Sequence, residues 1–381
     1  MNRLDQLKEY GFDIGVQERA REYQRERLLL EALESIALLA LLLLFAAFGS
    51  APLSDWVSRF AQGQWSVNLL YTLIFGLGLS VASLLPSWWE YQLERRYGLS
   101  VQRPRGWLAD ELKSGAVILV IFLAAFPSIY LGVVRSSIWW VTTWAVTTLF
   151  IVLLSFIAPV ILMPLFYKFT PLEDRELVSR LEGLVEKAGV KVLGVFKMAA
   201  GVKTRRAVGA LTGIGRTRRI ILSDTLLENW TPDEIETVIA HELGHHAHWD
   251  MWKLITVQSG LALLGFYLVH LALEPFAKTF GLGKDIASLP LFLIILGGVF
   301  FGLSPLTNGL SRSFEGQADQ YALELARKPE AQARVLVKIC DQNLRHAAPH
   351  PIVEFLVYNH PAGIRRVERA RRFLREVGAE R

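Results

Sequence analysis

The chain has 381 residues, of which 52% are hydrophobic, and its mean hydropathy is +0.32. This composition excludes an ordinary soluble domain and predicts several membrane-spanning helices. The formal net charge of +5 at pH 7 is the kind expected from Lys and Arg in cytoplasmic loops, so we expect no nucleic-acid partner. The single cysteine, Cys340, excludes an internal disulfide and a cysteine-based zinc finger, so any metal site must use His and carboxylate ligands.

Six segments are apolar and long enough to cross a hydrocarbon core, which takes about 20 residues each. They lie at residues 28–48, 67–85, 116–134, 138–162, 254–273 and 286–306. The fourth segment contains Pro159 and ends beside Pro164, and proline removes a main-chain donor, so we expect a kink there.

Basic residues alternate along the loops between these segments. The N-terminal tail and the second loop are rich in Lys and Arg, whereas the first and third loops contain only Arg59 and Arg135, respectively. The positive-inside rule therefore places the N-terminus in the cytoplasm, and six spans return the C-terminus to the same side. The polar N-terminus is not a cleaved signal peptide. We expect a multi-pass protein of the bacterial inner membrane with its active site on the cytoplasmic side, in contact with the lipid bilayer.

The spans divide the chain into four parts. Residues 1–166 form an N-terminal membrane domain with four spans, residues 167–253 a cytoplasmic catalytic block, residues 254–310 two further spans, and residues 311–381 a C-terminal helical block.

The catalytic block has helical periodicity over residues 177–188, and residues 192–196 and 219–222 have the β-branched and aliphatic composition of strands. Between these strands, Gly209, Gly213 and Gly215 indicate a turn or hairpin. Thr231 and Glu234 then form the two ends of a capping box, with Pro232 at the first helical position, so a helix is expected to begin here.

That helix contains His241-Glu242-Leu243-Gly244-His245, an H-E-x-x-H run. Residues four apart lie on one face of a helix, so both imidazoles can bind one Zn²⁺, with Glu242 beside the ion as general base for a water. The run also arises by chance in unrelated proteins, and by itself it leaves a metal site and a plain helix about equally open. The neighbouring His246 and His248 point off the ligand face and are interpreted as surface residues.

Two histidines leave a zinc ion short of a ligand. Glu315, just past the sixth span, is the best third candidate, and Asp319 lies four residues further on the same helical face. Asp319 suits the carboxylate that a metal-bound imidazole usually contacts through its other nitrogen. Taken alone, both carboxylates are more simply interpreted as solvated helix residues, and His360 as a loop or core histidine.

Further motifs occur in a fixed order along the chain: residues 86–90, 93–100, 110–113, 163–169 and 222–227, then Asn308 with Ser311-Arg312, and finally His360-Pro361. With the H-E-x-x-H run, they make the chain resemble the type I CAAX prenyl proteases, which are integral-membrane zinc metalloendopeptidases related to HtpX, and a bacterial member in particular. The resemblance covers about residues 86 to 370.

The resemblance implies one Zn²⁺ held by His241, His245 and Glu315, with Glu242 as the base. It implies that Asp319 orients a ligand histidine, and that His360 and Arg366 stabilise the oxyanion or hold the substrate. The implied fold is mainly α: a multi-span membrane helical bundle that encloses a chamber and is capped by a zincin-like metalloprotease domain with a small β-hairpin or sheet.

Two departures from the family stand out. The family usually has Asn-Ala on the strand that pairs with the substrate backbone, where this chain has Val208-Gly209, so a side-chain contact is lost. Eukaryotic members have seven spans, and six are counted here.

The expected function is that of a membrane-integral zinc metalloendopeptidase. Its substrates would be membrane-associated peptides, lipidated or amphipathic, or misfolded membrane proteins. The alternative is a zinc-binding membrane scaffold without turnover, which the retained Glu242 disfavours.

Overall fold

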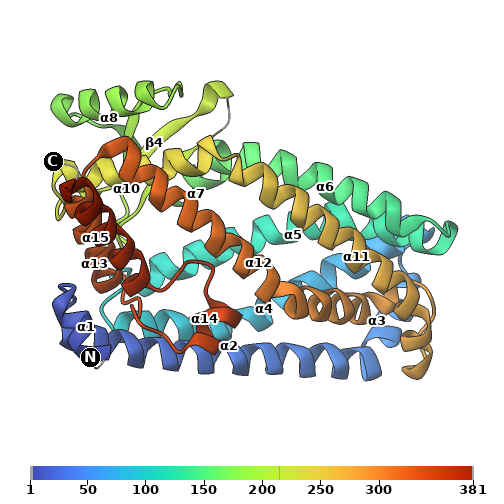
Figure 1. Cartoon of the computed structure of the whole chain (residues 1–381). Helices are drawn as coiled ribbons and strands as arrows, with labels where there is room; N and C mark the ends of the chain where they lie inside the picture. The colour runs from blue at the N-terminus through green and yellow to red at the C-terminus, as the bar shows by residue number, and fades with distance from the viewer. Residues whose placement is uncertain (1–2, 214, 380–381) are drawn as a thin grey trace.

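Six long helices form the body of the protein, which is described here by a computed structural model over residues 3–213 and 215–379. They are α2 (Ile14–Phe48), α4 (Gln64–Arg96), α5 (Pro104–Arg135), α6 (Trp139–Ile157), α11 (Asp250–Thr279) and α12 (Leu289–Ala326). Among the described residues, six helical segments are long and apolar enough to cross a membrane, which confirms the six predicted spans. Figure 1 shows them running between a catalytic end, which bears the sheet, and an opposite end near α3 (Ser50–Ser58).

The expected irregularity in the fourth span is present. After α6, the chain passes through a π-helical turn, η1 (Ala158–Leu162), into α7 (Met163–Phe166). Pro159 lies in the π turn and Pro164 in α7. Each proline lacks the N–H of a regular helix, and a π turn is a common way of absorbing such a break.

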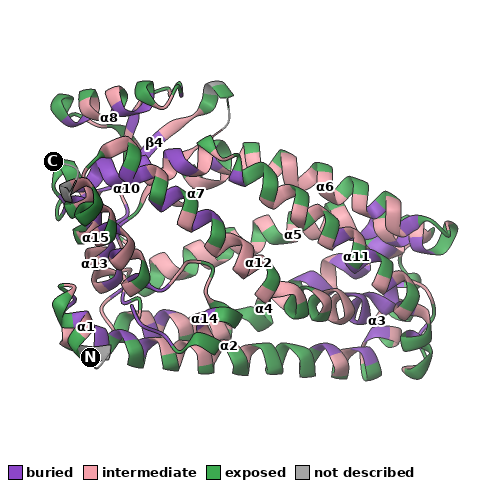
Figure 2. Cartoon of the chain, in the orientation of Figure 1, coloured by how far each residue is buried: buried purple, intermediate pink, exposed green. Residues whose placement is uncertain are grey.

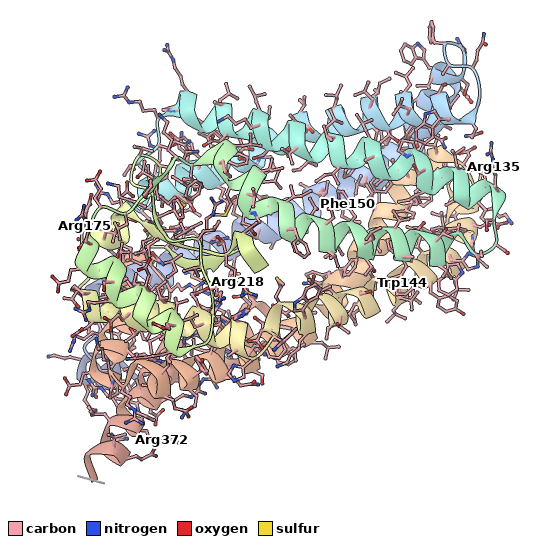
Figure 3. All side chains as sticks on the ribbon, turned by 90° about the horizontal axis from the view of Figure 1, so that it is seen from above. Arg135, Trp144, Phe150, Arg175, Arg218 and Arg372 are labelled. Atoms are coloured by element: carbon pink, nitrogen blue, oxygen red, sulfur yellow. The ribbon has the colours of Figure 1, made fainter. Side chains whose placement is uncertain are left out.

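The outer surfaces of the spans are apolar. On α2, Leu33, Ile36 and Leu44 are each at least 60% exposed, and Figure 2 shows most of this helix as exposed. Figure 3 places Trp144 and Phe150 along α6, between Arg135 at one end of the molecule and Arg175 at the other. Apolar surface of this extent between charged ends is what a bilayer covers.

The catalytic end contains a four-stranded sheet of β1 (Phe169–Pro171), β2 (Val195–Met198), β3 (Gly209–Thr212) and β4 (Arg219–Ser223). The order is β1-β2-β4-β3, with β2 and β4 parallel and the other pairs antiparallel. The predicted glycine hairpin is the β3–β4 pair. Gly213, at φ +86°, is required there because a Cβ would lie 2.4 Å from the main-chain oxygen of Thr217. The three-residue strand β1 is not predicted by the sequence pattern.

The remaining helices surround this sheet or extend the spans. They are α1 (Arg3–Glu9), α8 (Arg175–Lys187), α9 (Asp224–Leu227), α10 (Pro232–Ala247), α13 (Pro329–Gln342), α14 (Pro351–Val357) and α15 (Gly363–Ala379), with short 3₁₀ turns η2 (Gly215–Thr217) and η3 (Ile286–Ser288). The helix expected at 177–188 is α8, and the one expected after Thr231 is α10.

Buried apolar side chains gather at the two ends of the molecule, as Figure 2 shows. At the catalytic end, Leu181 of α8, Leu222 of β4 and Ile239 of α10 belong to one core. At the opposite end, Tyr130 and Phe292 belong to another, contributed by the spans. The catalytic helix α10 therefore rests on a rigid base that is separate from the membrane core.

Candidate active site

The start of α10 is fixed by the predicted capping box. Thr231 N donates to Glu234 Oε2 at 2.9 Å, and Glu234 N donates to Thr231 Oγ1 at 3.4 Å. The buried Glu234 carboxylate also accepts from Lys338 Nζ of α13 at 2.7 Å. The face of α10 that bears Ile235 and Ile239 is buried in the catalytic-end core. The helix therefore enters its H-E-x-x-H run with a set rotation.

Helices α10 and α12 cross in very close contact at Gly244. A Cβ on this residue would lie 2.9 Å from Ala318 Cα and 3.1 Å from its main-chain oxygen, closer than real side chains come. Ala318 is fully buried at the crossing. The small pair lets the backbones approach, and this approach brings Glu315 and Asp319 of α12 to the histidine face of α10.

Three donor groups converge at this crossing. The Nε2 atoms of His241 and His245 are 3.2 Å apart. Glu315 Oε2 lies 3.3 Å from His241 Nε2, and Glu315 Oε1 lies 3.4 Å from His245 Nε2. One possible ligand atom from each of the three residues lies within 4.8 Å of the other two. Ligands about 2.0–2.1 Å from a tetrahedral ion stand about 3.3 Å from one another, so these residues fit a zinc ion.

Each imidazole is backed by a buried aspartate. His241 Nδ1 lies 3.1 Å from Asp319 Oδ1. His245 Nδ1 lies 2.9 Å from Asp250 Oδ2. A carboxylate on the far nitrogen leaves Nε2 free to face a metal.

Asp250 is absent from the residues expected on sequence grounds. It is the first residue of α11 and follows Trp249, whose φ of +60° is left-handed and turns the chain sharply between α10 and α11. The corner lets Asp250 reach back five positions to His245. An acidic residue just past the H-E-x-x-H helix was the available signal.

The carboxylates around the two histidines favour their protonated forms. Burial by itself would lower the pKa of His241, but the Asp319 and Glu315 carboxylates raise it to about 9. Burial also disfavours the charged form of His245, but the Glu315 and Asp250 carboxylates raise its pKa. A bound cation would take the place of such a proton, because metal ligands must be neutral imidazoles.

Glu242 lies between the cluster and the edge strand. Burial raises its pKa, while the two ligand histidines oppose this shift, and the Leu211 main chain of β3 donates a hydrogen bond to it. A raised pKa suits a carboxylate that accepts and returns a proton near neutral pH. Among the described strands, β3 pairs only with β4, so its other edge is unpaired.

The departure at residues 208 and 209 has a local cause. A Cβ at Gly209 would lie 2.7 Å from Val238 Cγ1 of α10, so β3 runs too close to the catalytic helix for a larger residue. Val208 is 37% exposed, and its N–H and C=O are bound to Ser223.

His360 also reaches the cluster, with its Nε2 atom 3.2 Å from Glu315 Oε1. Its Nδ1 atom lies 2.7 Å from Asn359 Oδ1. Burial lowers the pKa of His360 to about 4, so the ring is neutral near pH 7. His360 lines a cavity of about 450 Å³ that is also bordered by Arg345 and Tyr358.

Arg366 of α15 contacts carboxylates. Its Nε and Nη2 atoms donate to the two Asp319 oxygens at 2.8 and 2.7 Å, and Nη2 lies 3.5 Å from Glu315 Oε2. The resemblance assigned Arg366 to the oxyanion or the substrate; here it pairs with Asp319 and lines the same cavity as His360.

The two other histidines of α10 lie away from the cluster. His248 Nδ1 lies 2.8 Å from the Gly244 main-chain oxygen, and its ring packs edge-on against Tyr321. Both His246 and His248 are partly exposed.

Two family profiles together match nearly the whole chain. Peptidase family M48 matches residues 171–374. The CAAX prenyl protease N-terminal region, described as five membrane helices, matches residues 8–168, where the described part of this chain has four membrane-capable helical segments.

Comparisons with individual proteins give the same family assignment. CAAX prenyl protease 1 of Saccharomyces cerevisiae is 31% identical over 340 residues, covering 80% of this chain and 71% of the relative. The uncharacterized metalloprotease YhfN of Bacillus subtilis is 27% identical over 331 residues, covering 84% and 77%. The crystal structure of Ste24p from S. mikatae superposes with a TM-score of 0.83 at 22% identity, over 96% of this chain and 90% of that one.

The superposition confirms the predicted fold class, in which membrane helices enclose a chamber and a metalloprotease region with a small sheet caps them. The family match confirms the predicted class of enzyme. The chain therefore belongs to peptidase family M48 and is a multi-pass membrane metalloendopeptidase of the CAAX prenyl protease group.

Proposed function

We propose that the protein is a zinc endopeptidase in which one Zn²⁺ is held by His241, His245 and Glu315. The observation that carries this proposal is the convergence of three donor groups. The two imidazole Nε2 atoms are 3.2 Å apart, one Glu315 oxygen lies 3.3 Å from His241 Nε2, and the other lies 3.4 Å from His245 Nε2, separations close to those between ligands of a tetrahedral zinc ion. In addition, Glu315 Oε2 is buried without a hydrogen-bond partner. Two imidazole nitrogens and an orphaned carboxylate oxygen that face one another are best satisfied by a cation.

A bound zinc ion supplies Lewis-acid chemistry, polarising the scissile carbonyl and making a water nucleophilic near neutral pH. Glu242 takes the proton of that water and passes it to the leaving amine. The imidazole of His360, which adjoins the cluster, contacts the substrate near the carbonyl oxygen on which negative charge develops.

The carboxylates around the ligands act as orienting groups. Asp319 and Asp250 hold the rings of His241 and His245, respectively. Arg366 neutralises Asp319 and fixes its orientation through two parallel hydrogen bonds, which favours a supporting role over direct contact with the substrate.

The substrate is an extended peptide segment. The unpaired edge of β3 can add such a segment as a further strand, through main-chain hydrogen bonds beside Glu242. Substrate choice then depends on access and extended conformation. We propose membrane-associated peptides, lipidated or amphipathic, and misfolded membrane proteins as the substrates.

The site lies at the membrane boundary on the cytoplasmic side. Only five positions separate His245 from Asp250, where the span α11 begins. The alternation of basic loops supports a cytoplasmic location for this end and for both termini, in what we propose is a bacterial inner membrane. The exposed Lys191 offers a test of orientation, because the only native cysteine, Cys340, is buried. Lys191→Cys is expected to react with an impermeant thiol reagent only when the cytoplasmic face is accessible, and labelling of intact cells from outside would contradict this orientation.

Turnover and metal content together test the proposed function. Purified wild-type protein in detergent is expected to contain about one zinc per chain by mass spectrometry and to cleave a quenched flexible peptide. Glu242→Gln is expected to retain zinc and to lose about 10²- to 10⁴-fold in kcat. Glu182→Gln, which changes an exposed carboxylate of α8, is the matched control.

Zinc in the wild type without any turnover would favour the scaffold alternative. Near-normal turnover in Glu242→Gln would refute the role of the base.

A further inference from the structure

His360 is held at the metal cluster by a segment that has little regular structure. It lies in residues 358–362, between α14 and α15, outside any described helix or strand. Its Nε2 atom must nevertheless stay within 3.2 Å of Glu315 Oε1. A loop this close to the chemistry needs anchors of its own, since small displacements of a reacting group are costly.

The first anchor is Arg312 of α12. Its Nη1 atom donates to three main-chain oxygens, those of Glu354 at 3.0 Å, Phe355 at 3.4 Å and Tyr358 at 2.5 Å. Two of these oxygens belong to α14 and the third to the first residue of the His360 segment, so Arg312 contacts the junction between them. These oxygens lie at the C-terminal end of α14, where the last carbonyls run short of intrahelical donors and a cation is favourable. Of the three, the Glu354 oxygen also accepts from Tyr358 N at 3.2 Å.

The second anchor is Asn308, one turn earlier on the same helix. Its Nδ2 atom donates to the main-chain oxygen of Leu356 at 2.8 Å. Asn308 and Arg312 together satisfy the C-terminal end of α14 from one face of α12.

The far end of the loop is tied back to α14. The buried Glu354 carboxylate accepts from Ala362 N at 2.9 Å and pairs with the Arg365 guanidinium. The loop therefore leaves α14 at Tyr358, which Arg312 holds, and returns at Ala362, which Glu354 holds.

We propose that Arg312, assisted by Asn308, is a positioning residue that sets His360 against the metal cluster. The same helix presents Glu315 three residues later, so α12 carries both a proposed zinc ligand and the anchor of the loop. The distance between His360 and the cluster is fixed through one rigid element. The inference rests on the proposed function, because it requires that His360 assist the reaction.

A double-mutant cycle tests this inference. His360→Ala and Arg312→Gln are made singly and together, and kcat, KM and bound zinc are measured with a flexible peptide. Arg312→Gln is expected to lower kcat by up to about 100-fold, with zinc content unchanged and KM within about twofold. In the His360→Ala background, Arg312→Gln is expected to have no further effect, because its only route to the reaction has been removed.

Two milder substitutions test the same inference if Arg312→Gln folds poorly. Arg312→Lys retains one charged donor and is expected to restore part of kcat, and Asn308→Ala removes a single hydrogen bond and is expected to give a smaller loss that also disappears in the His360→Ala background. Arg372→Gln, on the exposed side of α15, is the matched control and is expected to behave as wild type.

Equal effects of Arg312→Gln with and without His360 would overturn the inference, as would loss of zinc in a folded Arg312→Gln protein. Either result leaves the proposed function intact if Glu242→Gln is inactive with zinc bound. A wild-type kcat in His360→Ala would overturn both the inference and the part assigned to His360.

Discussion

The two ends of the bundle bury polar groups in different ways. At the catalytic end, α10, α12 and α15 meet through ionisable groups, with the Asp319–Arg366 pair at the centre. At the opposite end, the spans meet through uncharged hydroxyls. Tyr71 OH and the main-chain oxygen of Ala287 both bond Ser50 Oγ, and the buried Tyr130 OH lies 3.2 Å from Ser288 Oγ.

The difference follows from the cost of burial. A hydroxyl needs only one hydrogen-bond partner to offset its desolvation. A network of hydroxyls can therefore connect helices at a small cost in free energy. Buried charges are stable only when they are paired. Removing one partner leaves the other charge buried, with its desolvation free energy no longer offset. We therefore expect helices to meet through buried charges only where the chemistry of a functional site requires those charges. Substitutions at the catalytic end should change metal binding and activity, and those at the opposite end should change stability alone.

Glu315→Ala should have the largest effect. It removes the proposed carboxylate ligand and leaves Arg366 with less negative charge nearby, so zinc and activity should be lost together. Zinc content and turnover of the purified protein measure both. Full zinc content with normal turnover would show that Glu315 is only the ion-pair partner of the histidines.

Gly244→Ala should come next. Its methyl group would lie 2.9 Å from Ala318 Cα, so α12 must shift and carry Glu315 with it. Overpacking of this kind costs about 1–3 kcal/mol, and a ligand displaced by about 1 Å can cost about 100-fold in rate. Gly298→Ala, also on α12 but with nothing within 4 Å, is the matched control. Equal activity of the two variants would show that the crossing tolerates a side chain.

Asp250→Asn and Asp319→Asn should have intermediate effects. Each weakens the carboxylate behind one imidazole, and such partners typically contribute about 10- to 100-fold in metal affinity or activity. Zinc affinity measured by competition with a chelator checks both. Asp319→Asn should be the more harmful, because Arg366 is then buried without its bidentate partner. An unchanged affinity in Asp250→Asn would mean that this contact only closes the corner at Trp249.

Tyr71→Phe should have the smallest effect, and one of a different kind. It removes one hydroxyl from the far-end network and should lower the free energy of unfolding by about 0.5–1.5 kcal/mol. The thermal midpoint in detergent should fall while zinc content and kcat remain those of the wild type. A loss of zinc in this variant would show that the two ends are energetically coupled and would contradict the distinction between them.

The parts of the structure that the sequence could predict are local. The six spans follow from continuous apolar runs, and the start of α10 follows from Thr231, Pro232 and Glu234 within one turn. The convergence of His241 and His245 follows from helical spacing. Each of these depends on residues close together in the chain.

The parts that could not be predicted depend on packing between distant elements. Asp250 reaches His245 only because Trp249 adopts a left-handed conformation, which a Trp rarely does. Arg366 turns to Asp319 because of how α15 lies on α12, and no periodicity in either helix encodes that contact. The glycine at 209 is explained by Val238 of α10, a contact across the sheet face. Glu315 follows from its position just past the sixth span, whereas the roles of His360 and Arg366 came only from the resemblance to a family, which does not give their contacts.

The most direct test of the account is X-ray absorption at the zinc edge on the purified wild-type protein, with Glu242→Gln measured beside it. We expect one zinc per chain, bound by two imidazoles and a carboxylate at about 2.0–2.2 Å, with the same imidazole signal in the inactive variant. A site with fewer than two imidazoles, or zinc that binds equally well to His241→Ala, would contradict it.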